Sequence, residues 1–388
     1  MILKGTWKPI AVSLLVLLLP ACTTSPTTVH SPPHAKAEQS PSLLVQPSPA
    51  RSLASFKKGS KGVACYDRKK EPYTTVVDAH FHPRAFGGAS IPPQELFSYF
   101  DRLGVRFVNY FGIGQILPLG SGCTYYLDCP GVAAMPSIKN DFVNGMEVAA
   151  YQHPNVHVTL SMTFMDLAHP QGAAETIGLY DKEYPGMFAW AGELNVVKQA
   201  LVPNKHEVAT KKSIDEWAPF MRVLEQRGIP VTLHSDLGND DHPEEYLGLI
   251  QYAVSRYPNN KIVWAHAGLS KELQHIDPAR HMAILEDIFG RSNNVMIDLS
   301  WDVLYQAYHQ FGPEYAAFIN EHSDRVLTGS DFVAAGTKGF AQYAKELETT
   351  SRINQLLDNQ AFRRIALGEN YFRLLNLDFE APPICDAH

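Results

Sequence analysis

The stretch Val76-Val77-Asp78-Ala79-His80-Phe81-His82 is an apolar run that closes on a His-x-His pair. Because side chains alternate along a strand, His80 and His82 should share one side of it, with Asp78 one step deeper, where it could orient a ligand histidine. Three later apolar runs end in the same kind of residue: Val231-Thr232-Leu233-His234, Ile262-Val263-Trp264-Ala265-His266 and Val326-Leu327-Thr328-Gly329-Ser330-Asp331. Four strand-like runs that each end in a metal-binding residue type predict a divalent-metal site.

From about residue 72 onward, short apolar runs alternate with helical patterns. The expected strands are 74–79, 105–111, 156–163, 187–193, 229–234, 261–266, 294–299 and 325–329. The clearest expected helices between them are 93–103, 213–227 and 243–257. Eight strands alternating with helices predict a single (β/α)8 TIM barrel of the α/β class, and a doubly wound open sheet is the alternative. In a barrel the carboxyl ends of all strands share one face, so the four runs would bring their last residues together.

The composition limits the range of functions. The chain has 388 residues, of which 45% are hydrophobic and 19% charged, and this is typical of a globular protein with an ample core. The net charge of -7 and the absence of a long basic block argue against nucleic acid as a partner.

The amino terminus has the pattern of a targeting segment. Lys4 and Lys8 flank the start of an apolar stretch, 10–19, which is too short to span a bilayer as a mature helix. The stretch ends in Leu19-Pro20-Ala21-Cys22, which resembles a bacterial lipoprotein signal, in which cleavage precedes the cysteine and the thiol carries lipid. An ordinary signal peptide with an incidental Cys22 is the alternative.

The lipoprotein resemblance implies a signal peptide over 1–21 and attachment to a membrane through acyl chains on Cys22. In such lipoproteins, an Asp directly after the cysteine favours retention at the inner membrane. This chain has Thr23 there, which favours the outer membrane of the cell envelope. Residues 22–60 are rich in Ser, Thr and Pro, which predicts a disordered tether before a catalytic domain over 61–388.

Four more cysteines follow: Cys65, Cys123, Cys129 and Cys385. An even number in an exported protein suggests disulfides, and four cysteines allow three pairings. Cys123 and Cys129 lie within one Gly- and Tyr-containing loop, while Cys65 and Cys385 bracket a domain whose ends meet if it is a barrel. We therefore favour the pairs Cys123–Cys129 and Cys65–Cys385; four free thiols would suit a cytosolic enzyme better. The loop over 112–135 follows the second expected strand and is interpreted as a stapled wall of the substrate site.

These motifs together resemble the amidohydrolase superfamily, in particular its amidohydrolase-related branch of metal-dependent hydrolases and some nonoxidative decarboxylases. The resemblance spans about 74–378 and includes the stretch Ile365–Leu375, which is similar to a closing helix with the pattern Gly-x-Asn-x-x-x-Leu. It implies metal ligands at the ends of strands one, five, six and eight: His80, His82, His234, His266 and Asp331. Ala191-Gly192-Glu193-Leu194 resembles the Gly-Glu pattern of TatD-like relatives, so Glu193 either bridges two ions or binds substrate beside a single ion.

The resemblance implies hydrolysis by metal-activated water, with zinc or a similar divalent ion present as one or two ions. Asp331 would hold the water and accept its proton, and His266 would bind a second ion or hydrogen-bond the substrate. Arg84, Asp236 and Trp301 follow strand ends and are candidate substrate contacts. The expected substrate is a small-molecule ester, lactone, amide or phosphoester. A nonoxidative decarboxylase and a lipid-anchored binding protein with a non-catalytic metal site are the alternatives, and the oligomeric state is left open.

Overall fold

The computed structural model describes residues 51–71, 74–308 and 312–385. Its strands form one all-parallel sheet in the order β8-β7-β6-β5-β4-β3-β2-β1-β9. The strands are β1 (Val77–His82), β2 (Phe107–Tyr110), β3 (His157–Met162), β4 (Phe188–Val197), β5 (Val231–Ser235), β6 (Ile262–Trp264), β7 (Val295–Asp298), β8 (Val326–Leu327) and β9 (Phe332–Val333). All of them are largely buried, as expected of parallel strands covered by helices.

β8 and β9 are the two halves of an interrupted eighth strand. β8 pairs with β7, and β9 pairs with β1. In the gap between them the chain stays bonded to β1, because Ala79 N donates to Thr328 O at 3.0 Å and Asp331 N donates to His80 O at 2.8 Å. These bonds close the sheet, so the fold is the predicted (β/α)8 barrel.

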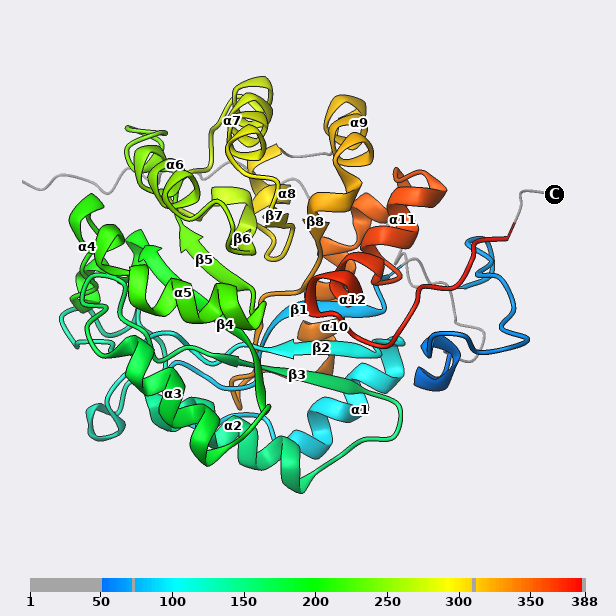
Figure 1. The fold of residues 1–388 in the computed structure, drawn as a ribbon, viewed down its shortest axis with the longest axis horizontal. Coiled ribbons are helices and arrows are strands. Elements are labelled where there is room, and N and C mark those ends of the chain that lie inside the picture. The colour runs from blue at the N-terminus through cyan, green and yellow to red at the C-terminus, as the bar shows by residue number, and fades with distance from the viewer. Residues whose placement is uncertain (1–50, 72–73, 309–311, 386–388) are drawn as a thin grey trace, which may run out of the picture. The chain divides into compact units, whose positions relative to one another are not determined.

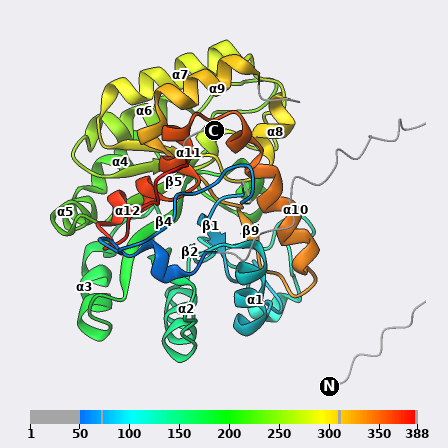
Figure 2. The same ribbon diagram turned by 90° about the vertical axis from the view of Figure 1, so that its right-hand side faces the viewer.

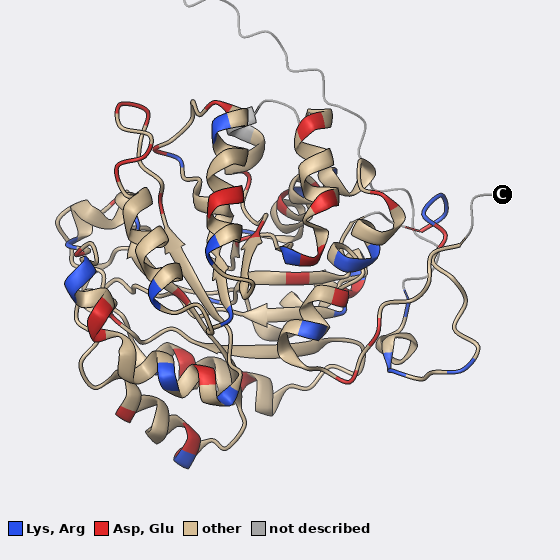
Figure 3. Ribbon diagram, turned by 45° about the horizontal axis from the view of Figure 1, so that its top comes forward, with Lys and Arg blue, Asp and Glu red and all other residues tan. Residues whose placement is uncertain are grey.

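Helices surround the sheet on its outer side (Figures 1 and 2). They are α1 (Pro93–Leu103), α2 (Ile138–Ala150), α3 (Ala173–Glu183), α4 (Lys211–Glu216), α5 (Ala218–Arg227), α6 (Leu247–Arg256), α7 (Pro278–Arg291), α8 (Val303–Tyr308), α9 (Pro313–Glu321), α10 (Phe340–Thr350), α11 (Asn359–Ile365) and α12 (Glu369–Leu375). Lys and Arg alternate with Asp and Glu over these helices without forming a region of one sign (Figure 3).

Three expected elements differ from the structure. The helix expected over 213–227 is two helices, α4 and α5, which meet at Trp217 just before Pro219. The helix expected over 243–257 begins only at Leu247, after a turn. β4 runs to Val197 rather than ending at 193, so Glu193 lies inside the strand and the strand continues beyond it.

The segment 51–71 packs onto the barrel. Phe56 is fully buried, with ring contacts to Phe107 at 5.4 Å and Phe372 at 6.5 Å. The Cα atoms of the paired Cys65 and Cys385 lie 4.8 Å apart, so this segment is tied to the carboxyl-terminal end of the described chain. Residues 51–60 therefore belong to the folded unit, although the sequence predicted a tether up to 60. The rest of that tether and the expected lipoprotein signal with Cys22 lie outside the described residues.

The described residues contain no helix with the length and apolar character needed to cross a membrane.

Candidate metal centre

All six residues predicted as metal ligands come together at the carboxyl ends of the strands. His80 and His82 end β1, Glu193 lies on β4, His234 on β5, His266 just after β6, and Asp331 between β8 and β9. His80 Nε2 lies 3.3 Å and His82 Nε2 3.1 Å from Asp331 Oδ1. His82 Nε2 and His266 Nε2 each lie 3.6 Å from a Glu193 oxygen. The histidines therefore surround two carboxylates.

The ligand atoms fall into three overlapping groups, within each of which all atoms lie within 4.8 Å of one another. The groups are His80 with His266 and Asp331, His80 with His82 and Glu193, and Glu193 with His234 and His266. Two of them share Glu193 and no other residue, and this is the arrangement that a carboxylate bridging two ions requires. Imidazole and carboxylate donors suit zinc and similar divalent ions.

Each histidine is oriented by a hydrogen bond on its outer nitrogen. His80 Nδ1 donates to Asp298 Oδ2 at 2.7 Å, and His82 Nδ1 donates to Gly112 O at 3.1 Å. His266 Nδ1 donates to Ser300 O at 3.2 Å. These bonds place a proton on Nδ1, so that Nε2, turned inward, is the nitrogen that can supply a lone pair to a metal ion.

Two of the histidine ring nitrogens that face the centre lack a hydrogen-bond partner. Within the described residues, His80 Nε2 and His266 Nε2 are buried and have no hydrogen-bond partner. Buried polar atoms are nearly always satisfied, so two such imidazole nitrogens facing carboxylates fit a site built for a cation.

His234 lies between two carboxylates. Its Nδ1 contacts Glu193 Oε1 closely, and its Nε2 donates to Asp236 Oδ1 at 2.8 Å. Burial and Lys198 act to lower the pKa of His234, but Glu193 and Asp236 outweigh them and raise it to about 9. Asp236, predicted as a substrate contact, is thus the residue that orients His234. It is also held by Gln199 N at 2.7 Å.

Lys198 directly follows β4 and is buried beside Glu193, with its Nζ 3.4 and 3.5 Å from the two carboxylate oxygens. Burial acts against charge on both groups, but the ammonium of Lys198 and the His234 ring hold the pKa of Glu193 well below its usual range. Glu193 therefore stays ionised, both as a candidate ligand and as the partner of a buried lysine.

Three residues of the centre have backbones in the left-handed region: His266 at φ 54°, Trp301 at φ 68° and Asp331 at φ 56°. This conformation is costly for residues other than glycine and is concentrated at functional sites. At the ends of strands six, seven and eight, the backbone therefore keeps an unfavourable conformation that places these side chains in the centre.

Asp78 does not orient a ligand histidine, contrary to the sequence-based expectation. Its carboxylate accepts hydrogen bonds from Ser330 N at 2.8 Å, Ser330 Oγ at 2.7 Å and Tyr343 Oη at 3.0 Å. It thus fixes the turn that carries Asp331. The orienting role for His80 belongs to Asp298 at the end of β7, which the sequence reasoning missed. The same strand-end pattern would have found it.

The other two predicted substrate contacts lie differently. Trp301 packs edge-on against the His266 ring with centroids 5.1 Å apart, so it lines the centre. Arg84 instead donates to Asn144 Oδ1 at 2.8 Å and pairs with Glu147, both on α2. In this structure its guanidinium anchors α2.

The loop after β2 carries the predicted bridge between Cys123 and Cys129, whose Cα atoms lie 6.1 Å apart. Its apolar residues form a second buried cluster with Phe86 and Leu201. Asn204 Nδ2 also donates to Cys129 O at 2.8 Å, which binds the stapled loop to the segment after β4. Both long loops of this face are therefore held against each other beside the centre.

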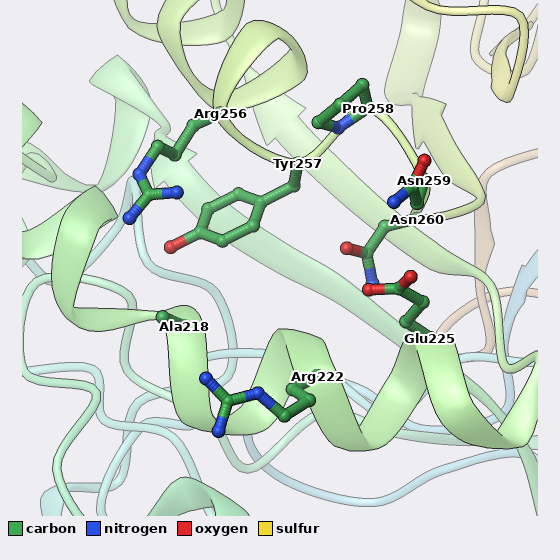
Figure 4. A pocket seen from close by; sticks show the side chains of 8 residues that line it. All are labelled: Ala218, Arg222, Glu225, Arg256, Tyr257, Pro258, Asn259 and Asn260. Atoms are coloured by element: carbon green, nitrogen blue, oxygen red, sulfur yellow. The ribbon is translucent and has the colours of Figure 1, made fainter.

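A separate cavity of about 230 Å³ lies between α5 and the turn before β6 (Figure 4). Arg222, Arg256 and Asn260 line it, and none of the candidate ligands does. It is at the amino ends of the strands, away from the metal centre.

Residues 186–377 match the family model described as amidohydrolase. The matched segment contains Glu193, His234, His266 and Asp331, and the His80–His82 pair precedes it. No curated protein matches the chain.

Several solved structures are similar to the chain at low identity. A zinc-bound amidohydrolase from Burkholderia multivorans is 16% identical, covers 78% of this chain and 99% of its own, and has a TM-score of 0.48. A dihydroorotase from Campylobacter jejuni is 13% identical, with 78% and 84% covered and a TM-score of 0.45. A β-aspartyl dipeptidase from Fervidobacterium islandicum is 16% identical, with 79% and 74% covered and a TM-score of 0.46. The match to the amidohydrolase model covers just under half of the chain, and the strand ends within and before the matched segment carry the candidate ligands described above.

Proposed function

We propose that the protein hydrolyses a small-molecule ester, lactone, amide or phosphoester with one or two zinc-like ions held at the centre described above. One observation carries the proposal. Each of four histidines gives one ring nitrogen to an acceptor outside the centre and turns the other towards Glu193 or Asp331. Metal-ligating histidines in proteins are almost always held this way.

The chain would hold the ions with His80, His82 and Asp331 on one side and His234 and His266 on the other, with Glu193 between them. A bound ion of this kind lowers the pKa of a water molecule towards neutrality and polarises a carbonyl or phosphoryl oxygen. Five of the six candidate ligands are buried, so solvent screens the charge of Glu193 only weakly.

Asp331 is the proposed general base. Its side chain is the most exposed of the six ligands, at 13%, so it alone among the carboxylates faces the open side of the centre. One oxygen is engaged by His80 and His82, and the strained turn between β8 and β9 holds the group in place. Asp331 would take a proton from the attacking water and return it to the leaving group, so that one water adds across the cleaved bond.

The test is Asp331→Asn, which keeps the size of the side chain and removes its proton acceptor. We expect kcat on the best substrate of an ester, lactone, amide and phosphoester panel to fall by about 10²-fold or more, while the thermal unfolding transition stays in place. The matched control is Asp324→Asn, in the 3-10 helix Ser323–Arg325 that precedes β8. A near-normal kcat for Asp331→Asn would remove it as the base.

We also propose that the enzyme is exported and anchored by lipid on Cys22, in the outer membrane of the cell envelope. Support comes from the charged start, the short apolar stretch and the Leu-Pro-Ala-Cys ending. Two paired cysteine bridges in the folded unit accord with an oxidising compartment.

A further inference from the structure

A buried carboxylate outside the metal centre has no part in the hydrolytic step proposed above. Asp141 lies in the first turn of α2 and is fully buried. Its Oδ2 accepts hydrogen bonds from Thr163 N at 2.8 Å and from Tyr180 Oη at 2.8 Å, and its Oδ1 accepts one from Thr163 Oγ1 at 2.6 Å. Thr163 directly follows β3, and Tyr180 lies on α3. The carboxylate therefore joins two helices to the carboxyl end of a strand.

Keeping a carboxylate at this position is costly, because burial disfavours its charged form. Burial raises the pKa of Asp141 to about 7, and the hydrogen bonds from Thr163 and Tyr180 act against that rise. An apolar side chain would fill the same space without this cost. A buried acid that is held by several hydrogen bonds therefore indicates that the position of its partners matters to the protein.

The Asp141–Thr163 pair lies directly against Gly112, the first residue of the stapled loop after β2. A Cβ at Gly112 would lie 2.2 Å from Thr163 Oγ1 and 2.8 Å from Asp141 Oδ1. The space that a side chain would need is thus occupied by two oxygens that are hydrogen-bonded to each other. Because β2 ends at Tyr110, pairing in the sheet does not extend to Gly112. The contact with Asp141 and Thr163 fixes its backbone instead.

Gly112 carries the carbonyl that orients one of the candidate metal ligands. His82 Nδ1 donates to Gly112 O at 3.1 Å, and His82 Nε2, on the other side of the ring, lies 3.1 Å from Asp331 Oδ1. The imidazole ring is rigid, so a displacement of Gly112 O would also move Nε2. The orientation of His82 therefore depends on a main-chain carbonyl that lies beyond the end of its strand.

We infer that Asp141 and Thr163 are positioning residues of the metal centre, which hold the Gly112 carbonyl where it turns His82 Nε2 towards the ion. Neither is one of the six candidate ligands, and both act through the backbone of Gly112. The inference rests on the proposed metal site and adds a further layer of support behind it. Asp141 and Thr163 are 22 residues apart in the sequence. The loop leaves the barrel at Gly112, and α2 brings Asp141 back against that residue, so the pair sets the position of His82 independently of the outer part of the loop.

The test compares two substitutions at one position. Thr163→Val replaces the hydroxyl with a larger methyl group, which leaves Asp141 Oδ1 without its donor and presses on Gly112, whereas Thr163→Ser keeps the hydroxyl. Full-length protein that has been stripped of metal is titrated with zinc ions in competition with a chromophoric chelator. We expect the zinc dissociation constant to rise by at least about tenfold in Thr163→Val and to stay within about twofold of the wild type in Thr163→Ser, because the outer partners of metal-ligating histidines affect metal affinity by about 10- to 100-fold.

Thr159→Val is the matched control, since it removes a buried hydroxyl from β3 itself. Thr159 Oγ1 accepts from Tyr371 Oη at 2.8 Å, so this change should lower the free energy of unfolding and leave the zinc affinity unchanged.

A second measurement does not need the metal. In metal-free protein with isotope-labelled histidine, nuclear magnetic resonance should show that the Nδ1 proton of His82 exchanges slowly with water in the wild type and in Thr163→Ser. The same proton should exchange faster in Thr163→Val, because the carbonyl that accepts it has moved.

Wild-type zinc affinity in Thr163→Val would overturn the inference, and so would an equal loss of affinity in Thr163→Val and Thr159→Val. If Thr163→Val does not fold, Asp141→Asn decides by the same criteria, because its amide nitrogen cannot accept the hydrogen bond that one carboxylate oxygen accepts. A wild type that binds no zinc would remove the proposed metal site. The exchange of the His82 proton then decides the inference alone: faster exchange in the variant keeps it, and unchanged exchange overturns it.

Discussion

At the scale of single residues, position in the metal centre is set by hydrogen bonds just outside it. The network that orients His80 also reaches His266, because Asp298 accepts from His80 and also contacts Ser300, whose carbonyl accepts from His266. One carboxylate on β7 thus fixes two ligands from different strands. The energetic cost of burying it is offset by the charge-assisted bonds that it accepts.

His281 on α7 supports the same region from behind. Its Nε2 donates to Ala267 O at 2.8 Å, within the left-handed turn that follows His266. Burial lowers the pKa of His281 to about 4. Since an unfolded histidine titrates near 6.5, the unfolded state takes up this proton first as the pH falls, and the folded state loses stability between about pH 6.5 and 4.

We therefore predict that His281→Gln, which keeps a donor for Ala267 O, flattens this part of the pH dependence. Relative to the variant, the wild type should lose up to about 3 kcal/mol of unfolding free energy between pH 6.5 and 4. The measurement is urea unfolding at several pH values, taken as the difference between the two proteins so that other titrating groups cancel. Parallel curves would show that His281 does not contribute.

The sequence predicted that these six side chains would meet, because each one ends or interrupts an apolar run and parallel strands in a barrel end on one face. It could not assign the neighbours of those ligands. Alternation along β1 places Asp78 on the side of His80, but only the path of the eighth strand decides that Ser330 and Tyr343 reach it. β4 continues past its expected end at 193, and this extension determines where Lys198 meets Glu193.

At the scale of elements, the interrupted eighth strand determines the geometry of the centre. β8 and β9 are each only two residues long, and the turn between them presents Asp331 to the histidines. The turn approaches β1 closely at Gly329, where a Cβ would lie 2.6 Å from His80 N and 2.7 Å from His80 Cβ. Glycine is required there because no side chain fits between the two strands.

Gly329→Ala should therefore destabilise the fold by about 1–3 kcal/mol and displace His80, with a matching loss of metal affinity. Gly178→Ala on α3 is the control, since its added methyl group meets no atom within 4 Å. In a helix interior that change should stabilise by about 0.5–1 kcal/mol. Urea unfolding compares the two, and equal stability of Gly329→Ala and the wild type would contradict the close approach.

All the expected strands are present in the structure. Where the boundary of an element differs from the expected one, the difference has a physical reason. The pattern over 213–227 has one helical period, but Pro219 lacks an N–H, and Trp217 turns inward to donate from Nε1 to Leu167 O at 2.9 Å. The chain therefore ends α4 there and begins α5. Such a break depends on a partner 50 residues away in the sequence, and the periodicity of a short segment carries no information about that partner.

At the scale of the whole molecule, the described chain is tied at both ends. The segment 51–71 inserts Phe56 into the core and is joined to Cys385 through Cys65. A bridge that closes a loop of this length raises stability by a few kcal/mol in the chain-entropy account.

The proposed anchor predicts that growth with a labelled fatty acid marks the wild-type protein and not Cys22→Ala. The reason is that the thiol of Cys22 is the only attachment point that the signal motif provides. Thr23→Ala keeps the cysteine and serves as the control that must still be labelled. Equal label in Cys22→Ala would place the lipid elsewhere or exclude it.

The central claim is that these strand ends hold a divalent metal for hydrolysis, and elemental analysis of the purified protein tests it most directly. Protein prepared without chelator should carry one or two equivalents of zinc or a similar metal. The double variant His80→Ala/His82→Ala should carry less than about half an equivalent, because it loses two of the ligands on one side of Glu193. A wild type that contains no metal and still hydrolyses its substrate would contradict the account.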